Sequence, residues 1–329
     1  KYRFSMSVGR ITYFYLEPMS FFEFLQASGH DALHRKLSAV TFDAGLAVSL
    51  HEKCLKLYQT YCLMGGMPEV VQAWINTENL EECIKIQHDI LTTFRDDFHK
   101  YGGEMEAATL SKIMLGVARQ LGNKFVYSRV DPAGKAGPIK KAFHLLCRAK
   151  VCSKVAHSTG NGLPLGAESN EKFFKALMVD IGLISAQLGI SSTRRREAET
   201  LVLSNKGGLA EQFVGQQLRA MKSPMVDASL FYWQRTGGRQ GEIDYLLQYG
   251  SRVVPLEVKS GPAGSMKSLH QFMAEKGLDF AVRCNFNLPT LENIKMKTTQ
   301  GRPVSYRLLS IPVYLTQCLD RLMAEAGKD

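Results

Sequence analysis

The sequence of 329 residues lacks the features that mark membrane, secreted and zinc-binding proteins. No apolar run approaches the roughly 18 residues that span a bilayer, and the first residues alternate charges with aromatics, unlike a signal peptide. The 7 cysteines are scattered and none forms a CxxC pair, which argues against a disulfide framework and a zinc site. We therefore expect a cytoplasmic protein with buried thiols and no membrane partner.

A GxxxxGK[ST] phosphate loop is also missing, so the chain by itself is not expected to hydrolyse ATP. What is present is an ordinary globular balance, with 45% hydrophobic and 22% charged residues. At this length the chain should form two or three domains, each with its own core.

Carboxylates are scarce in one short segment of the chain. Residues 99–167 hold 11 basic and 3 acidic side chains, whereas residues 1–98 hold 9 basic and 12 acidic ones. Between Pro132 and Ala167 there are 6 Lys or Arg residues and no carboxylate. The net charge of +10 is thus concentrated in this segment, which indicates a polyanionic partner. A solvated basic face without a partner is the alternative.

The basic segment has the order of elements that a winged helix requires. Apolar residues at helical spacing predict a helix over residues 107–121 and a second one that begins at Pro138. A strand beginning at Val151 and a tip at Gly160-Asn161-Gly162 would complete a hairpin. A helix-helix-hairpin unit can also be a plain spacer. The residues expected to bind nucleic acid, with DNA favoured over RNA, lie on the second helix: Lys140, Lys141 and Arg148.

Helical patterns dominate the chain before this segment. Ser20 is placed to cap a short helix, with Glu23 at the capping-box position. A turn at residues 65–68 follows. One apolar stripe then marks a long helix that should end at Gly102-Gly103, and its positions are Leu80, Ile84, Gln87, Leu91, Phe94 and Phe98.

From Gly208 onward the pattern becomes α/β, and several ionisable side chains follow one another in it. Residues 209–220 are expected to be helical, with Glu211 in the first turn. Two strands, over residues 241–247 and 253–259, should form a hairpin that turns at Gly250-Ser251. Their acidic and basic side chains are Asp244 on the first strand and Glu257 and Lys259 on the second.

These side chains predict a metal-dependent active site. The hairpin can place Asp244 beside Glu257, and two converging carboxylates repel each other unless a cation lies between them. We expect this cation to be Mg²⁺ or Mn²⁺, bound by Asp244 and Glu257. Lys259 would orient or deprotonate a metal-bound water or neutralise a scissile phosphate, and Glu211 would bind a second ion or a metal-bound water. A surface hairpin with solvated charges is the alternative.

The series Glu211, Asp244 and Glu257-Val258-Lys259 resembles the signature of the PD-(D/E)XK nuclease superfamily. The wider pattern resembles bacterial and archaeal AAA-type ATPases that carry a C-terminal domain of unknown function. The segments that carry this wider resemblance are Val8-Gly9-Arg10, Pro18 to Leu25, Gly65-Gly66-Met67-Pro68-Glu69, Asp97-Phe98-His99-Lys100-Tyr101, Asp180-Ile181-Gly182-Leu183, Glu211-Gln212-Phe213-Val214 and Glu257-Val258-Lys259-Ser260.

The resemblance implies an α/β protein with four parts. Residues 1–28 would be the tail of an AAA-type ATPase domain, residues 29–103 a helical connector, residues 104–167 a winged-helix-like basic domain, and residues 168–329 a restriction-endonuclease-like domain with a mixed central sheet. ATP would then be bound only by an ATPase domain upstream of Lys1, which would be a partner of this chain. Whether Arg10 serves as a nucleotide-sensing arginine would depend on that domain.

Three functions stay open at this point. The first is metal-dependent hydrolysis of nucleic-acid phosphodiesters, with the basic segment binding the backbone of the nucleic acid. The second is a non-catalytic DNA-binding or regulatory module that uses the nuclease fold as a scaffold. The third is an interaction arm of a multi-subunit ATPase without any nucleic acid. A homo-oligomer is compatible with each of them.

Overall fold

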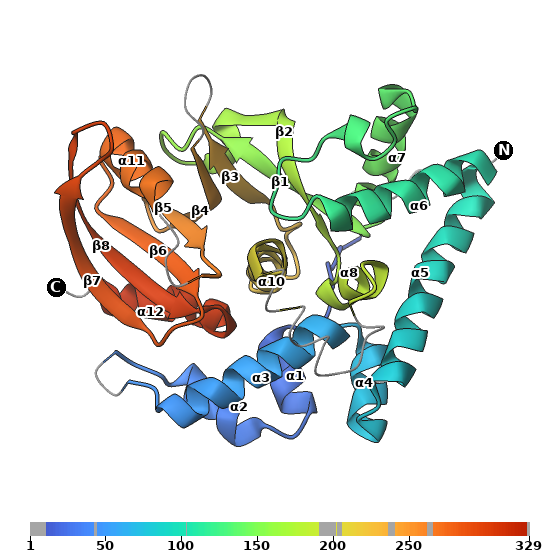
Figure 1. Cartoon of the computed structure of the whole chain (residues 1–329), viewed down its shortest axis with the longest axis horizontal. Helices are drawn as coiled ribbons and strands as arrows, with labels where there is room; N and C mark the ends of the chain where they lie inside the picture. Colours follow the sequence, from blue (N-terminus) through green and yellow to red (C-terminus); the bar gives the residue numbers. More distant parts are fainter. Residues whose placement is uncertain are drawn as a thin grey trace.

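The structure is a computed structural model that describes residues 11–42, 45–102, 104–190, 202, 206–235, 241–261 and 266–327. Among these residues, helices precede one eight-stranded mixed sheet whose strands all follow Val151 (Figure 1). The expected α/β class, with a helical N-terminal part and a mixed C-terminal sheet, is confirmed. Within the described ranges no helix is both long and apolar enough to cross a bilayer. Arg10, the candidate nucleotide-sensing arginine, lies outside these ranges.

The helical part begins with the expected capping box. The backbone N–H of Glu23 donates to Ser20 Oγ at 3.3 Å, and the N–H of Ser20 donates back to Glu23 Oε2 at 2.7 Å. The helices of this part are α1 (Phe21–Ala27), α2 (Asp31–Ser38), α3 (Val48–Met64), α4 (Pro68–Thr77) and α5 (Leu80–Gly102).

Helix α5 confirms the long stripe read from the sequence, and Gly102 is its last residue. Gln87 and Leu91 are buried, while Ile84 and Phe94 are half-buried. The one polar member of the stripe is satisfied in part, because Gln87 Nε2 donates to the carbonyls of Leu63 and Met64 at 2.8 and 3.0 Å. The side chain of Phe98 lies outside the described residues.

The middle of the chain has the helix-turn-helix-hairpin order that the sequence predicts. Its elements are α6 (Glu104–Arg119), η1 (Tyr127–Arg129), α7 (Ala136–Arg148), β1 (Cys152–Ser158), η2 (Leu165–Glu168) and β2 (Ser169–Met178). The hairpin is not a separate wing, because β1 pairs with β2 on one side and, in parallel, with β3 (Leu230–Gln234) on the other. The expected boundary at residues 167/168 therefore falls inside the β1–β2 connection, and the domain boundaries stay a prediction.

The expected wing tip packs against the rest of the molecule. Lys276 Nζ donates to Asn161 Oδ1 at 2.6 Å, and a Cβ at Gly160 would lie 3.0 Å from the Phe272 ring. Lys276 and Phe272 both belong to α11 (Lys267–Lys276). A tip held against a helix in this way is not positioned to enter a nucleic-acid groove as a free wing would.

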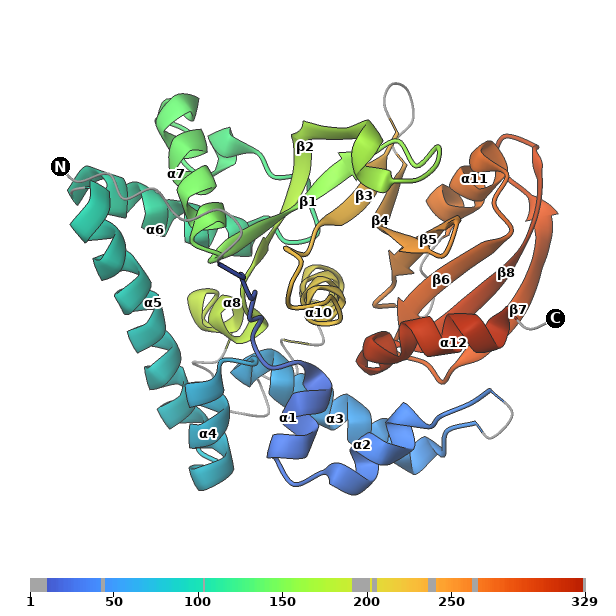
Figure 2. The same cartoon turned by 180° about the vertical axis from the view of Figure 1, so that it is seen from behind.

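The remaining elements complete the sheet. They are α8 (Ile181–Gln187), α10 (Lys206–Ala220), β3 (Leu230–Gln234), β4 (Glu242–Tyr249), β5 (Arg252–Val258), β6 (Phe280–Asn285), β7 (Thr290–Lys297), β8 (Pro303–Pro312), η3 (Val313–Cys318) and α12 (Leu319–Ala326). The strand order is β2-β1-β3-β4-β5-β6-β8-β7. The β4–β5 hairpin turns as predicted, with Tyr249 opposite Arg252 and Gly250 at φ 56°. Figure 2 shows α12 beside the β6–β8 end of the sheet and α7 at the other end.

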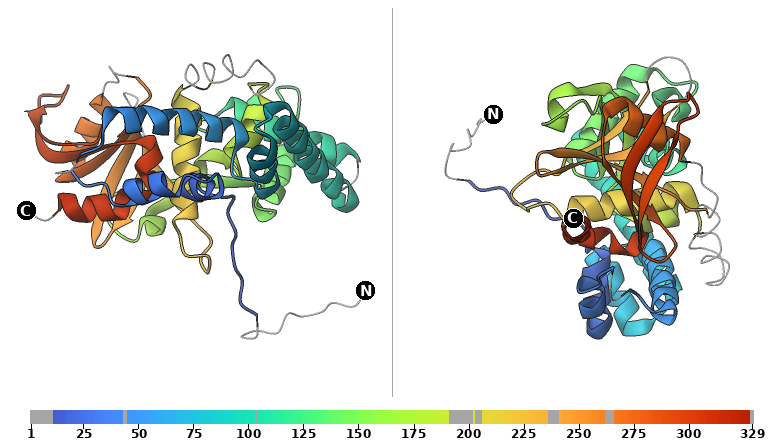
Figure 3. Two further views of the ribbon diagram at one scale, coloured as in Figure 1. Left: turned by 90° about the horizontal axis from the view of Figure 1, so that it is seen from below. Right: turned by 90° about the vertical axis from the view of Figure 1, so that its left-hand side faces the viewer.

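Helix α10 lies between the sheet and the helical part (Figure 3). Its Phe213 is fully buried and packs edge-on against the aromatic rings of Phe21, Tyr58 and Tyr61, whose centroids lie 4.8–6.0 Å away. Edge-to-face packing of this kind adds to the free energy gained by burying the rings. The first and last thirds of the chain therefore share one hydrophobic core through α10.

A buried aspartate joins the helical part to the sheet part. The Asp180 side chain caps α8 by accepting from the N–H groups of Gly182 and Leu183 at 2.9 and 3.2 Å. It also accepts from the N–H of Gly66 at 2.7 Å and from Gln216 Nε2 at 3.1 Å. Two of the segments that carry the wider resemblance, at Gly65 and at Asp180, are thus in direct contact.

Candidate functional site

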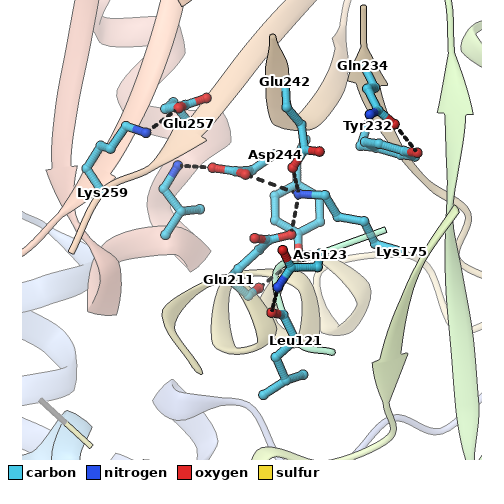
Figure 4. Close-up of polar contacts among 12 residues, drawn as sticks. Leu121, Asn123, Lys175, Glu211, Tyr232, Gln234, Glu242, Asp244, Glu257 and Lys259 are labelled. Carbon is cyan, nitrogen blue, oxygen red and sulfur yellow. Dashed lines mark hydrogen bonds and ion pairs between the residues drawn. The ribbon is translucent and has the colours of Figure 1, made fainter. Parts of the chain in front are cut away.

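The four residues expected to form the active site lie together at one place on the sheet (Figure 4). Glu211 comes from the second turn of α10, because this helix begins at Lys206, before the expected residue 209, so the expected first-turn position of Glu211 is wrong. Asp244 comes from β4, Glu257 from the end of β5, and Lys259 directly follows that strand. A fifth residue joins them, because Glu242 lies two positions before Asp244 and shares its face of the strand.

Lys175 of β2 lies in the middle of three of these carboxylates, those of Glu211, Glu242 and Asp244 (Figure 4). Its Nζ is 2.7 Å from Glu211 Oε1 and 3.2 Å from Asp244 Oδ1, and it also forms an ion pair with Glu242. Only 1% of the side chain is exposed. Burial alone would lower the pKa of Lys175, but the charges of the surrounding carboxylates outweigh it and hold that pKa well above its usual value.

Lys175 and Glu242 were not predicted as site residues from the sequence. The strand that carries Lys175 reads Phe-Phe-Lys-Ala-Leu-Met over residues 173–178, and a single lysine in such an apolar run is a signal of a buried, paired charge. Glu242 could have been found from its i, i+2 spacing to Asp244.

Glu257 and Asp244 each pair with a different lysine. Lys259 Nζ lies 2.5 Å from Glu257 Oε1. Asp244 binds Lys175 through Oδ1 and accepts from the backbone N–H of Val258 through Oδ2, at 2.8 Å. The buried Oε2 of Glu257 has no hydrogen-bond partner among the described residues.

Burial raises the pKa of two carboxyl groups in this cluster. The pKa of Glu211 rises to about 8, although the charge of Lys175 acts to lower it. The pKa of Glu257 also rises to about 8, with the charge of Asp244 acting in the same direction as burial and that of Lys259 opposing it. Negative charge at this place is therefore poorly compensated, and a proton or an added cation would relieve it.

These shifts predict that the protein becomes less stable as the pH rises. In the unfolded chain the pKa of Glu211 and Glu257 is near 4.5, so between about 4.5 and about 8 the folded state binds more protons. The free energy of unfolding then falls as the pH rises through this window. Replacing Glu257 with glutamine should flatten the fall of the melting temperature between pH 5 and pH 8, measured by calorimetry in EDTA.

The matched control for this experiment is Glu171→Gln, which changes an exposed glutamate of the same sheet. Its melting curve should follow the wild-type pH dependence. Parallel curves for wild type and Glu257→Gln would contradict the assignment of the pH effect to the buried cluster.

The charge of the cluster would suit one divalent cation. Its formal charge is −2 when all groups are ionised, because four carboxylates face the two ammonium groups of Lys175 and Lys259. Glu257 Oε2 is unpaired among the described residues, and each Asp244 oxygen keeps a lone pair besides the hydrogen bond it accepts. Oxygen ligands of this kind suit Mg²⁺ or Mn²⁺.

A second ion beside Glu211 does not fit, because the Lys175 ammonium holds that position. Within the described ranges no three side chains of His, Cys, Asp and Glu already converge as metal ligands. An ion would itself have to bring Asp244 and Glu257 together, and their shared binding of metal stays a prediction.

The residues expected to bind nucleic acid lie on the opposite face of the sheet. Neighbouring residues of a strand point to opposite faces. Lys175 points to Glu211 of α10, whereas Phe174 stacks on Phe143 of α7 with ring centroids 5.1 Å apart. The predicted residues on α7 are all exposed: Lys140, Lys141 and Arg148. Nucleic acid bound along α7 would have to pass β2, the strand at the edge of the sheet, to reach the acid cluster.

A basic cavity adjoins this helix. It has a volume of about 500 Å³ and lies between α7, β1 and the start of β3. Two of the basic side chains that line it already form ion pairs within the protein. Lys150 binds Asp227 at 2.5 Å, and Arg219 binds Glu17 at 2.6 Å. The surface around α7 is therefore partly neutralised by the protein itself.

Comparison with known proteins gives two partial matches. Residues 55–194 match the domain of unknown function DUF8612, and residues 206–299 match the domain of unknown function DUF4143. No curated protein and no solved structure matches the chain significantly. The acidic residues and Lys259 fall in the second matched segment, whereas Lys175 falls in the first. The site is thus assembled from both segments.

Proposed function

We propose that this chain is a metal-dependent nuclease-like enzyme that hydrolyses phosphodiester bonds of nucleic acid. The observation that carries the proposal is the meeting of Glu211, Asp244, Glu257 and Lys259, from α10, β4 and the end of β5, in one cluster in which the buried Oε2 of Glu257 is unpaired among the described residues. Negative charge without a complete set of partners is expected where a divalent cation completes a site.

The chemistry would be divided among these residues. Asp244 and Glu257 would hold Mg²⁺ or Mn²⁺, which when bound supplies a Lewis acid for activating water and polarising the phosphate. Glu257 holds Lys259 in place through their 2.5 Å ion pair. The Lys259 side chain is 26% exposed, so its ammonium can approach a phosphate and stabilise the charge that develops there.

The order of elements and the DUF4143 match support the same proposal. A helix, three antiparallel strands, a second helix and a parallel strand follow one another in α10, β3, β4, β5, α11 and β6, which suits the nuclease-like module that the resemblance implies. DUF4143 is found in C-terminal regions associated with AAA-type ATPases. ATP binding by an upstream domain is part of the proposal.

A non-catalytic DNA-binding or regulatory scaffold is the second candidate, and one observation favours it. Lys175 already compensates three carboxylates of the cluster, as expected of a buried ion-pair network that stabilises a fold. The placement of α7 on the face away from the cluster is also compatible with DNA binding without cleavage.

A cleavage assay separates the two candidates. The purified chain is incubated with plasmid DNA, single-stranded DNA and RNA, with Mg²⁺ or Mn²⁺ and with EDTA. The proposal expects cleavage that needs the metal and is abolished in Asp244→Asn, a variant that keeps the shape of the side chain. No metal-dependent cleavage of any of these substrates, in this chain or in the full-length natural protein, would show that the enzyme proposal is wrong.

Nucleic-acid binding through α7 is tested by a charge variant. Replacing Lys140, Lys141 and Arg148 with alanine should weaken DNA binding at every sequence, because interactions with the phosphate backbone carry no sequence information. The slope of binding against salt concentration should fall by about one unit for each phosphate group that the variant no longer binds. Fluorescence anisotropy at several salt concentrations measures both quantities.

The control removes the same charge from the other side of the molecule. The exposed residues to be replaced by alanine are Lys36 of α2 and Lys53 and Lys56 of α3. This variant should bind with nearly wild-type affinity and slope. If both triple variants are weakened equally, binding depends on net charge alone and α7 is not the docking element.

A further inference from the structure

We infer that Lys175 is the resident cation of the acid cluster and takes the place that a divalent ion would otherwise occupy between Glu211, Glu242 and Asp244. This inference concerns how many ions the site accepts. It holds whether or not the site cleaves nucleic acid.

The donors of Lys175 match the acceptors that surround it in number. A lysine ammonium has three N–H donors. Three carboxylates surround Lys175 Nζ, with Glu211 at 2.7 Å, Asp244 at 3.2 Å and Glu242 in direct contact. Each of its three N–H donors can therefore be satisfied by a carboxylate oxygen. The same oxygens would be the ligands of a metal ion at this position.

The side chains of Lys175 and Glu211 are both buried. The side chain of Lys175 is 1% exposed and that of Glu211 is 7% exposed. Burying an ammonium costs much free energy unless it is paired and hydrogen-bonded, and the same holds for the carboxylates that pair with it. The ring of Tyr232, with its centroid 5.5 Å from Nζ, supports the charge from another side.

Lys175 and its partners are fixed on separate elements of the fold. Lys175 is in the interior of β2, opposite Val155 of β1. Helix α10 is held at Glu211 itself by Tyr245, whose hydroxyl donates to the carbonyl of Glu211 at 2.7 Å. Asp244 is fixed by the N–H of Val258 at 2.8 Å. The ammonium is therefore held in the cluster by a strand that is itself hydrogen-bonded to β1.

The consequence is a limit on metal binding. With Lys175 in place, the position among Glu211, Glu242 and Asp244 is filled, and a divalent ion is left with the unpaired oxygen of Glu257 and the remaining lone pairs of Asp244. Removing the lysine charge leaves three carboxylates without their cation. The cluster should then take up one more divalent ion than the wild-type protein does.

Calorimetric titration with Mn²⁺ alone tests this inference. Lys175→Met and Lys175→Gln both remove the charge, and the glutamine also keeps hydrogen-bond donors for the carboxylates. Each variant should bind one more Mn²⁺ per chain than wild type, and Mn²⁺ should raise its melting temperature by more than it raises that of wild type. The control is Lys172→Met, which changes an exposed lysine of the same strand and should bind metal as wild type does.

Each outcome decides the inference. A folded Lys175 variant that binds no more Mn²⁺ than wild type would overturn it. If neither variant folds in EDTA, recovery of the folded state by Mn²⁺ but not by NaCl of equal ionic strength supports it, and no recovery overturns it. Failure of the proposed nuclease function would appear separately, as absence of cleavage by wild type, because the titration uses no nucleic acid.

Discussion

Replacing Lys259 with alanine should reduce metal-dependent phosphodiester cleavage by ~10²–10³-fold, the usual effect of removing one group that stabilises charge in a transition state. Of the two lysines in the cluster, only Lys259 is open to a substrate, since it is 26% exposed whereas Lys175 is 1% exposed. Because neither Asp244 nor Glu257 is changed, Mn²⁺ binding should persist. Cleavage rate, Mn²⁺ affinity and melting temperature are measured on the same preparations.

The electrostatics of Lys259 refine its role. Burial would lower the pKa of Lys259, but the charge of Glu257 outweighs it and raises that pKa above its usual value. A lysine that stays protonated at neutral pH acts as a positive charge rather than as a base toward water. The proposed role is therefore to neutralise the phosphate, and the alternative that Lys259 deprotonates a metal-bound water is disfavoured.

Two further variants sharpen this experiment. Lys259→Arg should not restore the rate, because a planar guanidinium does not replace a compact ammonium in the same geometry. Lys267→Ala changes an exposed lysine of α11 and should leave the rate near the wild-type value. If Lys259→Ala cleaves as fast as wild type, Lys259 has no part in the chemistry. A scaffold predicts a loss of stability without any effect on cleavage, because Lys259→Ala leaves the buried Glu257 carboxylate without its partner.

The parts of the site that were predictable from sequence are those fixed by local pattern. The β4–β5 hairpin follows from two alternating strands around Gly250-Ser251, and it sets Asp244 near Glu257 without any knowledge of the rest of the fold. Glu211 follows from a helical segment directly before the strands. The capping box at Ser20 is equally local, since its residues are three positions apart.

The parts that were not predictable depend on interactions between distant segments. Lys175 reaches Glu211 across 36 positions of the chain, and no periodicity specifies which strand will lie beside which helix. The parallel pairing of β1 with β3 is of the same kind, and it makes the expected wing part of the main sheet. It also separates α7 from the acid cluster by placing them on opposite faces.

Replacing Gly182 with alanine should lower the free energy of unfolding by more than about 4 kcal/mol, a size reserved for changes that the backbone cannot relieve. A Cβ at Gly182 would lie 2.2 Å from the carbonyl oxygen of Met64 and 2.5 Å from the backbone nitrogen of Gly65. Relief would require α8 to move away from the end of α3. The 2.7 Å hydrogen bond from the N–H of Gly66 to Asp180 would then break, leaving a buried carboxylate with fewer donors.

The matched control for Gly182→Ala is Gly137→Ala, since each glycine is the second residue of its helix. No heavy atom of the described residues lies within 4 Å of a Cβ built at Gly137, so that variant should be neutral or more stable by up to ~1 kcal/mol. Urea denaturation measures both changes. If Gly182→Ala unfolds like Gly137→Ala, the packing of α8 against α3 is not tight. In that case Asp180 would not fix the helical part against the sheet, and the resemblance at these two segments would need a cause other than packing.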